Sequence, residues 1–162
     1  MRLKIFYSQI SDEVVQIIQK GLKTTYVDVL DIVIEGELEL LKEAYSSRRN
    51  QYNSDILLNY LINIKKGDAA LWVIHEDLYC SGMNFIFGYA MYHKGAVLSI
   101  SRLSSQDLIE REAIHEVGHV LGLRHCSNYC VMQFSNSLWE AKTKPSYLCD
   151  ICKSRIKSLI NH

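Results

Sequence analysis

The polar and apolar positions at the start of the chain predict a strand, a helix and a second strand. Residues 2–7 alternate polar and apolar side chains, as in a strand with one buried face. Ser11 can then cap a helix whose apolar stripe ends before Gly21. Residues 26–34 are rich in β-branched side chains and predict a second strand, so the simplest connection is a βαβ unit with a parallel pair. Residues 35–50 are charged and lack a clear period, which predicts a loop with some helical character.

The middle of the chain predicts a helix followed by three strands. The apolar side chains of residues 53–66 follow a helical stripe, and Gly67 ends it. The three predicted strands are residues 70–75, 85–92 and 96–101, the last two joined as a hairpin through residues 93–95. A parallel pair combined with a hairpin predicts a mixed, twisted sheet.

Two further helices are predicted toward the C-terminus. One spans about residues 106–121 and the other about residues 149–160. Between them lies a poorly patterned segment with the single proline, Pro145. Strands interleaved with helices predict an α/β (α+β) fold, and 162 residues fit one domain with a substantial core.

Charge and composition narrow the choice of partners and location. Lys plus Arg equals Asp plus Glu, at 18 each, so no bulk field would draw the chain to nucleic acid or to an anionic membrane. The N-terminal residues lack the apolar core of a signal peptide, and no stretch approaches membrane-spanning length. We therefore expect a cytoplasmic monomer with neither a nucleic acid nor a membrane partner.

The segment HEVGHVLGLRH contains the strongest chemical signal. His115 and His119 are four residues apart, so a helix would project both imidazoles from one face toward a single zinc ion. Gly122 can end the helix and turn the chain, which would bring His125 round as a third ligand. Three protein ligands leave a fourth position for water, which is typical of catalytic zinc. Glu116 is then placed to act as general base on that water.

The competing interpretation of this segment is a surface helix with solvated histidines. Ile114, Val117 and Leu121, however, lie at core-facing spacing along the same helix. That spacing predicts an amphipathic helix packed on a domain, so the catalytic interpretation is favoured.

Four of the five cysteines form two close pairs, Cys126 with Cys130 and Cys149 with Cys152. Because cytosolic thiols are held reduced, the pairs indicate a tetrahedral four-cysteine zinc site. Two disulfides, or a redox pair at Cys149 and Cys152, stay open as alternatives. Cys80 stands apart and is expected to be a buried or half-buried small hydrophobe, with a reactive thiol as the alternative.

HExxHxxGxxH is the signature of the metzincin metallopeptidases, and a cysteine directly after the third histidine narrows the match. The chain resembles the archaemetzincins, in which that cysteine is followed by Cys-x-Met and by a later CxxC. In this chain these residues are Cys126, Cys130-Val131-Met132 and Cys149-Asp150-Ile151-Cys152. The likeness extends upstream through RRNQY at 48–52, DLY at 77–79 and NFIFGYA at 84–90. The spacing between the first two cysteines and the spacing from Met132 to the CxxC are each one residue shorter than in the family pattern.

The resemblance implies a metzincin-like zincin domain over residues 1–162. Residues 1–122 would form an N-terminal subdomain with the sheet and the active-site helix. Residues 123–162 would contain a Met-turn, the four-cysteine zinc site and the C-terminal helix.

The resemblance also implies a zinc metallopeptidase with two zinc ions, one catalytic and one structural. The catalytic ion would be bound by His115, His119 and His125, and Met132 would form the Met-turn beneath it. Ordinary core packing is the alternative for Met132. The structural ion would be bound by Cys126, Cys130, Cys149 and Cys152.

The expected reaction is hydrolysis of a peptide bond by a zinc-bound water that Glu116 activates, with a peptide or protein as substrate. An aminopeptidase and a short-peptide protease both fit this reaction. The alternatives are a zinc-scaffolded peptide-binding or latent protein with little turnover, and a hydrolase of non-peptide amides or esters. The 85–92 segment could offer an open strand edge to an extended peptide. Tyr129 and Tyr147 are weak candidates for stabilising the oxyanion.

Overall fold

The core is a mixed five-stranded sheet in which β2, β1, β5, β8 and β7 lie side by side in that order. This computed structural model describes residues 1–161, so His162, the last residue of the expected domain, lies outside them. Four strands are parallel, and β7, at one edge, pairs antiparallel with β8. The strands are β1 (Arg2–Ser8), β2 (Asp31–Glu37), β5 (Ala69–Ile74), β7 (Gly88–Met91) and β8 (Gly95–Ser99). The predicted mixed sheet, βαβ unit and hairpin are thereby confirmed.

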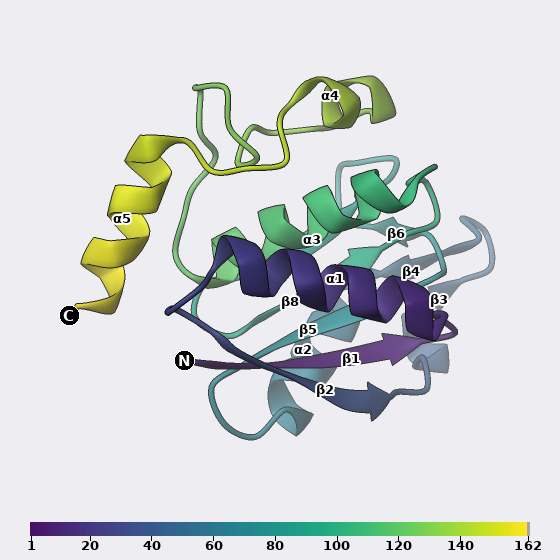
Figure 1. Ribbon diagram of the computed structural model, residues 1–162. Coiled ribbons are helices and arrows are strands. Elements are labelled where there is room, and N and C mark those ends of the chain that lie inside the picture. The colour runs from purple at the N-terminus through teal and green to yellow at the C-terminus, as the bar shows by residue number, and fades with distance from the viewer. Residues whose placement is uncertain (162) are drawn as a thin grey trace.

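Helices cover both faces of the sheet. α1 (Asp12–Thr25) and α3 (Gln106–Val120) lie on one face, and α2 (Ser54–Ile64) lies on the other (Figure 1). The central strand β5 is buried along its whole length, because its successive side chains enter the two cores in turn. Leu71 and Val73 pack under α1 and α3, whereas Trp72 and Ile74 pack toward α2.

Three predicted boundaries were wrong. α1 continues through Gly21 to Thr25, and its backbone cap is Tyr26. Residues 26–30 form a turn before β2, because Tyr26 is buried and its hydroxyl donates to the Ile114 carbonyl at 2.6 Å. β7 starts at Gly88, three residues later than predicted. In each case tertiary contacts outweigh local propensity.

Several short elements were not predicted. A three-stranded sheet is formed by β3 (Tyr45–Ser46), β4 (Gln51–Asn53) and β6 (Leu78–Tyr79). The 3₁₀ turn η1 (Lys42–Ala44), which precedes it, agrees with the helical character expected within residues 35–50. α4 (Leu138–Thr143) is capped by the Ser137 hydroxyl. Strands of two or three residues pair with partners remote in sequence, so no local period marks them.

The C-terminal segment lies on the side of α3 away from the sheet. α4 sits above α3, and α5 (Asp150–Ile160) stands beyond its end, as Figure 1 shows. α5 begins after Cys149, as predicted. Among residues 1–161, no helix combines the length and apolar character needed to cross a membrane. The cytoplasmic location and the monomeric state stay predictions.

The absence of a side chain at Gly118 lets α3 pack closely on Met132 and Tyr26. A Cβ at this position would collide with Met132 Sδ and lie 3.0 Å from the Tyr26 hydroxyl. Neither neighbour can easily move, because Met132 is fully buried and Tyr26 is held by its hydrogen bond to Ile114. The close packing of α3 on Met132 and Tyr26 therefore requires glycine at position 118.

Gly118→Ala should lower the free energy of unfolding by about 1–3 kcal/mol, because it overpacks an immobile part of the core. Gly21→Ala is the matched control, since the three atoms nearest to a Cβ there all belong to the Glu110 side chain, which is half-exposed and can swing away. The control should be neutral or gain helix stability. Urea unfolding measures the free energy of unfolding of both variants. Equal values for the two would contradict the claim that α3 needs glycine at position 118.

Candidate active site

α3 presents His115, Glu116 and His119 near its C-terminal end, and the turn that follows brings His125 back toward them. Gly122 adopts φ +103°, and the Leu123 and Gly122 N–H groups donate to the Gly118 and His119 carbonyls, both at 2.9 Å. This pair of bonds is a Schellman motif, in which the left-handed residue is usually glycine. The helix thus ends at the residue that the sequence singles out.

The three imidazoles converge, and their orientation is fixed by backbone carbonyls. His115 Nδ1 lies 2.8 Å from the Val131 oxygen, and His119 Nδ1 lies 2.7 Å from the Leu123 oxygen. Because a carbonyl only accepts, each Nδ1 carries the proton and each Nε2 keeps a free lone pair. The two Nε2 atoms are 3.1 Å apart, and the ligand atoms of His115, His119 and His125 all lie within 4.8 Å of one another. Such a donor set suits a zinc ion.

The local electrostatics keep these histidines neutral, which metal binding requires. Burial, followed by the nearby Lys144 ammonium, holds the pKa of His115 well below its usual range. Burial lowers the pKa of His119 to about 4, and burial with Lys144 also lowers the pKa of His125. At neutral pH all three therefore offer lone pairs.

A buried ion pair, which sequence reasoning missed, lies behind the first histidine. Lys144 Nζ is 2.9 Å from Glu112 Oε1, 3.3 Å from His115 Nδ1 and 3.2 Å from the Gln133 carbonyl, to which it donates. Burial raises the pKa of Glu112, and burial together with Glu112 raises the pKa of Glu116 to about 8. Glu112 is one helical turn before Glu116, a spacing that could have identified it. Nothing in the local pattern marks Lys144.

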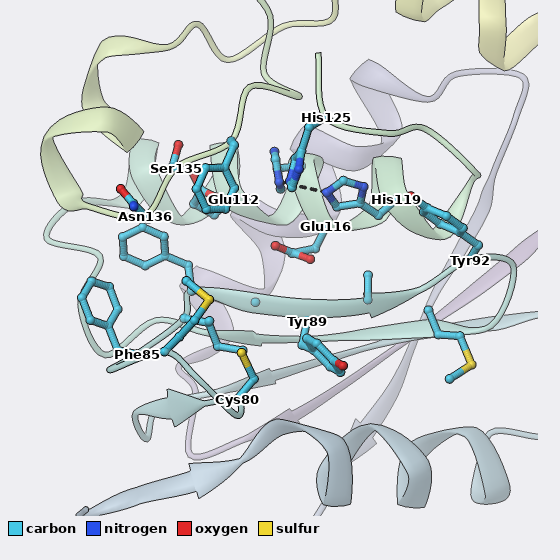
Figure 2. A pocket seen from close by; sticks show the side chains of 18 residues that line it. Cys80, Phe85, Tyr89, Tyr92, Glu112, Glu116, His119, His125, Ser135 and Asn136 are labelled. Atoms are coloured by element: carbon cyan, nitrogen blue, oxygen red, sulfur yellow. Dashed lines mark hydrogen bonds between the residues drawn. The ribbon is translucent and has the colours of Figure 1, made fainter. Parts of the chain in front are cut away.

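A cleft of about 460 Å³ opens in front of the imidazoles. His119, His125 and Glu116 project into it from above β7 in Figure 2. A Cβ on Gly88 would lie 2.5 Å from the Glu116 side chain, so this glycine makes room for the carboxylate. Cys80 lines the cleft and is half-buried, as expected for it, and burial raises the pKa of its thiol.

The edge strand β7 presents free backbone groups. Ser99 N–H donates to the Phe87 carbonyl at 2.8 Å, and bonded pairs alternate along an antiparallel ladder. Tyr89 and Met91 therefore bond to β8, whereas the N–H and C=O groups of Gly88 and Ala90 point away from it. The segment predicted to offer an open edge does so from Gly88 onward.

The four paired cysteines also meet, despite the short spacings between them. The sulfur atoms of Cys126, Cys130, Cys149 and Cys152 lie within 4.8 Å of one another, and all four are free thiols. The N–H groups of Met132 and Cys149 donate to Cys130 Sγ at 3.4 and 3.3 Å. Although burial opposes it, hydrogen bonds from the Cys152 N–H and the other thiols lower the pKa of Cys149 to about 6. Such a cluster could hold a second metal ion.

Met132 joins the two clusters. Its side chain is fully buried under Gly118, and its carbonyl accepts from the Cys126 N–H at 3.0 Å. The imidazoles and the thiols are thus held against one short stretch of chain.

Tyr129 and Tyr147 lie elsewhere. Both are more than half exposed, their rings are 6.2 Å apart, and neither lines the cleft. The cleft instead contains Tyr89 and Tyr92, and the Tyr92 ring lies 6.3 Å from that of His119. The proximity of Tyr129 and Tyr147 to the motif in sequence was a poor guide, because the turns after His125 carry them away.

The chain matches known proteins over nearly its whole length. The model of peptidase family M54 matches residues 2–158. The archaemetzincin of Archaeoglobus fulgidus is 37% identical over 97% of this chain and 99% of its own length. The archaemetzincin of Nanoarchaeum equitans is 42% identical over 74% of this chain and 71% of its own.

Solved structures agree with this match. The crystal structure of archaemetzincin from Methanopyrus kandleri has a TM-score of 0.90 and 31% identity, and covers 100% of this chain and 96% of its own. The Archaeoglobus fulgidus archaemetzincin, complexed with malonate, has a TM-score of 0.86 and 34% identity, with 96% and 99% covered. These matches confirm the predicted fold and the resemblance. The chain therefore belongs to peptidase family M54, the archaemetzincins, and is a zinc metallopeptidase.

Proposed function

We propose that this chain hydrolyses peptide bonds in the cleft, with Glu116 as general base and with His115, His119 and His125 holding the catalytic zinc. One observation carries the proposal: three neutral imidazoles and one carboxylate converge beside the free edge of a strand. The family supports a peptide or protein as substrate. The proposed hydrolysis is compatible with an aminopeptidase and with a protease of short peptides.

The residues of the chain would divide the work as follows. A bound zinc would supply a Lewis acid and make a water molecule more acidic. The free backbone groups of Gly88 and Ala90 would hold the peptide extended along β7. Burial raises the pKa of Glu116, but the positive charge of a bound zinc would favour its ionised form. The resulting carboxylate, which reaches the cleft because Gly88 has no side chain, would take a proton from water and pass it to the leaving amine.

We further propose that the four cysteines hold a second, structural zinc. Four thiolates leave no open coordination position, so this ion would take no part in the reaction. It would tie the chain after α3 to the first residues of α5, and residues 123–162 would owe their order to it. The N–H groups that donate to Cys130 support a thiolate there.

The first prediction concerns metal content. The purified protein should contain two zinc ions per chain, and His119→Ala should lose one and keep the other, because the thiol cluster does not involve His119. Mass spectrometry of native protein and elemental analysis both count the ions. A single zinc in the unaltered protein, or loss of both in His119→Ala, would contradict independent sites.

The second prediction concerns Glu116. Glu116→Gln should keep both zinc ions and the fold, but its rate of peptide cleavage should fall by about 10²–10⁴, the usual contribution of a general base. Cleavage of a random peptide mixture, followed by mass spectrometry, measures this and reveals the preferred bond. If the unaltered protein binds peptides yet cleaves none, the chain is a binding or latent protein instead.

The third prediction concerns the thiol cluster. Cys152→Ser should lose one zinc and markedly lower the unfolding temperature, because the buried thiol is replaced and metal binding stabilises the fold. Cys80→Ser is the matched control and should keep both zinc ions. Unchanged zinc content in Cys152→Ser would reject the structural role.

A further inference from the structure

One wall of the cleft is formed by residues 83–87, here called the wall segment. Met83, Phe85 and Phe87 all line the cleft, and the segment leads directly into β7. Within residues 1–161, only two main-chain bonds support its start and middle, Met83 N–H to the Cys80 carbonyl and Ile86 N–H to the Leu78 carbonyl. Something beyond regular pairing must therefore fix its shape.

Arg49 and Gln51 fix the carbonyl groups of the wall segment. Arg49 Nη2 donates to the Met83 carbonyl at 2.8 Å and lies 3.5 Å from that of Asn84, and its Nε donates to Gln51 Oε1 at 2.9 Å. Gln51 Nε2 in turn donates to the Asn84 carbonyl at 2.7 Å. The Arg49 guanidinium also stacks on the Tyr79 ring at 4.0 Å. Side chains thus donate hydrogen bonds to carbonyl groups that have no partner in a neighbouring strand.

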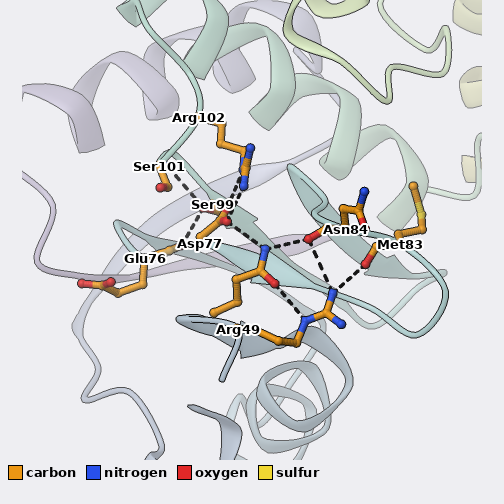
Figure 3. A network of polar contacts seen from close by, with 9 residues as sticks. Arg49, Glu76, Asp77, Met83, Asn84, Ser99, Ser101 and Arg102 are labelled. Carbon is orange, nitrogen blue, oxygen red and sulfur yellow. Dashed lines mark hydrogen bonds and ion pairs between the residues drawn. The ribbon is translucent and has the colours of Figure 1, made fainter. Parts of the chain in front are cut away.

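Arg102 fixes the side-chain face of the same segment. It forms two hydrogen bonds to the Asp77 carboxylate, both at 2.9 Å, and its guanidinium lies 3.9 Å from the centre of the Phe85 ring. Asp77 also accepts from Gln51 at 2.9 Å, so the network is continuous from Arg49 to Arg102 (Figure 3). Burial alone would raise the pKa of Asp77, but these bonds outweigh it and lower that pKa.

Most residues of this network fall within the upstream stretches that resemble the family. Arg49 and Gln51 belong to RRNQY, Asp77 begins DLY, and the wall segment overlaps NFIFGYA. RRNQY is remote in sequence from DLY and NFIFGYA, and it meets them at one place, next to the cleft and outside the metal cluster.

We propose that Arg49, Gln51, Asp77 and Arg102, here called the clamp, are positioning residues that hold the wall segment so that it selects a large apolar substrate side chain. The wall offers Met83, Phe85 and Phe87. Phe134, whose ring lies 5.1 Å from that of His125, also lines the cleft. These side chains present carbon and sulfur, so an aromatic or long aliphatic group would bury apolar surface there and a charged group would lose its hydration. The inference rests on the proposed function in one respect, that a peptide enters this cleft.

The test measures peptide binding without turnover, in zinc-loaded full-length protein with Glu116→Gln. Two fluorescent peptides of equal length differ at one central position, Phe or Ala. We expect the Phe peptide to bind about tenfold more tightly, as judged by fluorescence anisotropy. Arg49→Lys keeps the charge but loses the fork that bonds the Met83 carbonyl and Gln51 Oε1 at the same time, so it should reduce that ratio several-fold.

Amide hydrogen exchange gives a second readout, independent of any ligand. Exchange over residues 83–87 should accelerate in Arg49→Lys, with unchanged zinc content. Arg102→Lys, at a side chain that is 44% exposed, provides a second variant should the first fold poorly. Arg48→Lys is the control, because Arg48 is exposed and makes no side-chain hydrogen bond or ion pair with any described residue.

The outcomes separate cleanly. If amide hydrogen exchange over residues 83–87 is unchanged in both Arg49→Lys and Arg102→Lys, the proposal that the clamp holds the wall segment is rejected. Faster exchange with an unchanged Phe-to-Ala ratio, or equal or absent binding of the two peptides by the Glu116→Gln protein, overturns the selective role of the wall. If the unaltered protein cleaves neither peptide while selective binding still depends on Arg49, the proposed hydrolysis is rejected and this inference stands.

Discussion

The position of α3 is the constraint on which the rest of the molecule depends. Ten of its fifteen residues are buried, so the helix that presents the imidazoles is also a central part of the core. Close contacts at Gly118 set its height above Met132, and Tyr26 holds its middle through the Ile114 carbonyl. A helix seated in this way cannot rotate, and the two imidazoles on it share that rigidity.

The backbone carbonyl groups near α3 fix the orientation and the tautomer of the imidazole rings. Val131 and Leu123 lie beyond the helix, yet their oxygens fix the rings of His115 and His119. Fixing a ring by its outer nitrogen selects the tautomer that leaves the inner nitrogen free, which is how protein metal sites are commonly supported. The turn at Gly122 thus has two roles, because it brings His125 inward and also places the Leu123 carbonyl. The buried Lys144 and Glu112 neutralise each other and satisfy the back of the site, at a desolvation cost that an apolar pair would avoid.

The convergence of the three imidazoles could be predicted from sequence because these residues are close together in the chain. His115, Glu116 and His119 occupy a single helix, and the glycine turn that brings in His125 is three residues away, so helix geometry and a glycine preference were sufficient. The boundaries of β2 and β7 could not be predicted in this way, because the buried hydroxyl of Tyr26 and the approach of Glu116 to Gly88 are tertiary effects. Lys144 is the clearest example of a site residue that could not be predicted from sequence. It lies in a segment without pattern, and only the folded chain brings it within 3.3 Å of a histidine 29 residues earlier.

The cleft is built from two parts that are fixed by different forces. The side that carries the imidazoles depends on the packing of α3 and on the thiol cluster. The opposite wall depends on hydrogen bonds from Arg49 and Gln51 and on the Arg102–Asp77 pair. The two parts share β7 but no polar partner, and free-energy changes at sites without shared partners are nearly additive. Substitutions in the wall can therefore alter which side chain fits without disturbing the imidazoles. Gly88 is the exception, because a carboxylate from one part and a strand from the other approach there so closely that no side chain is tolerated. A substitution at Gly88 would therefore affect both parts.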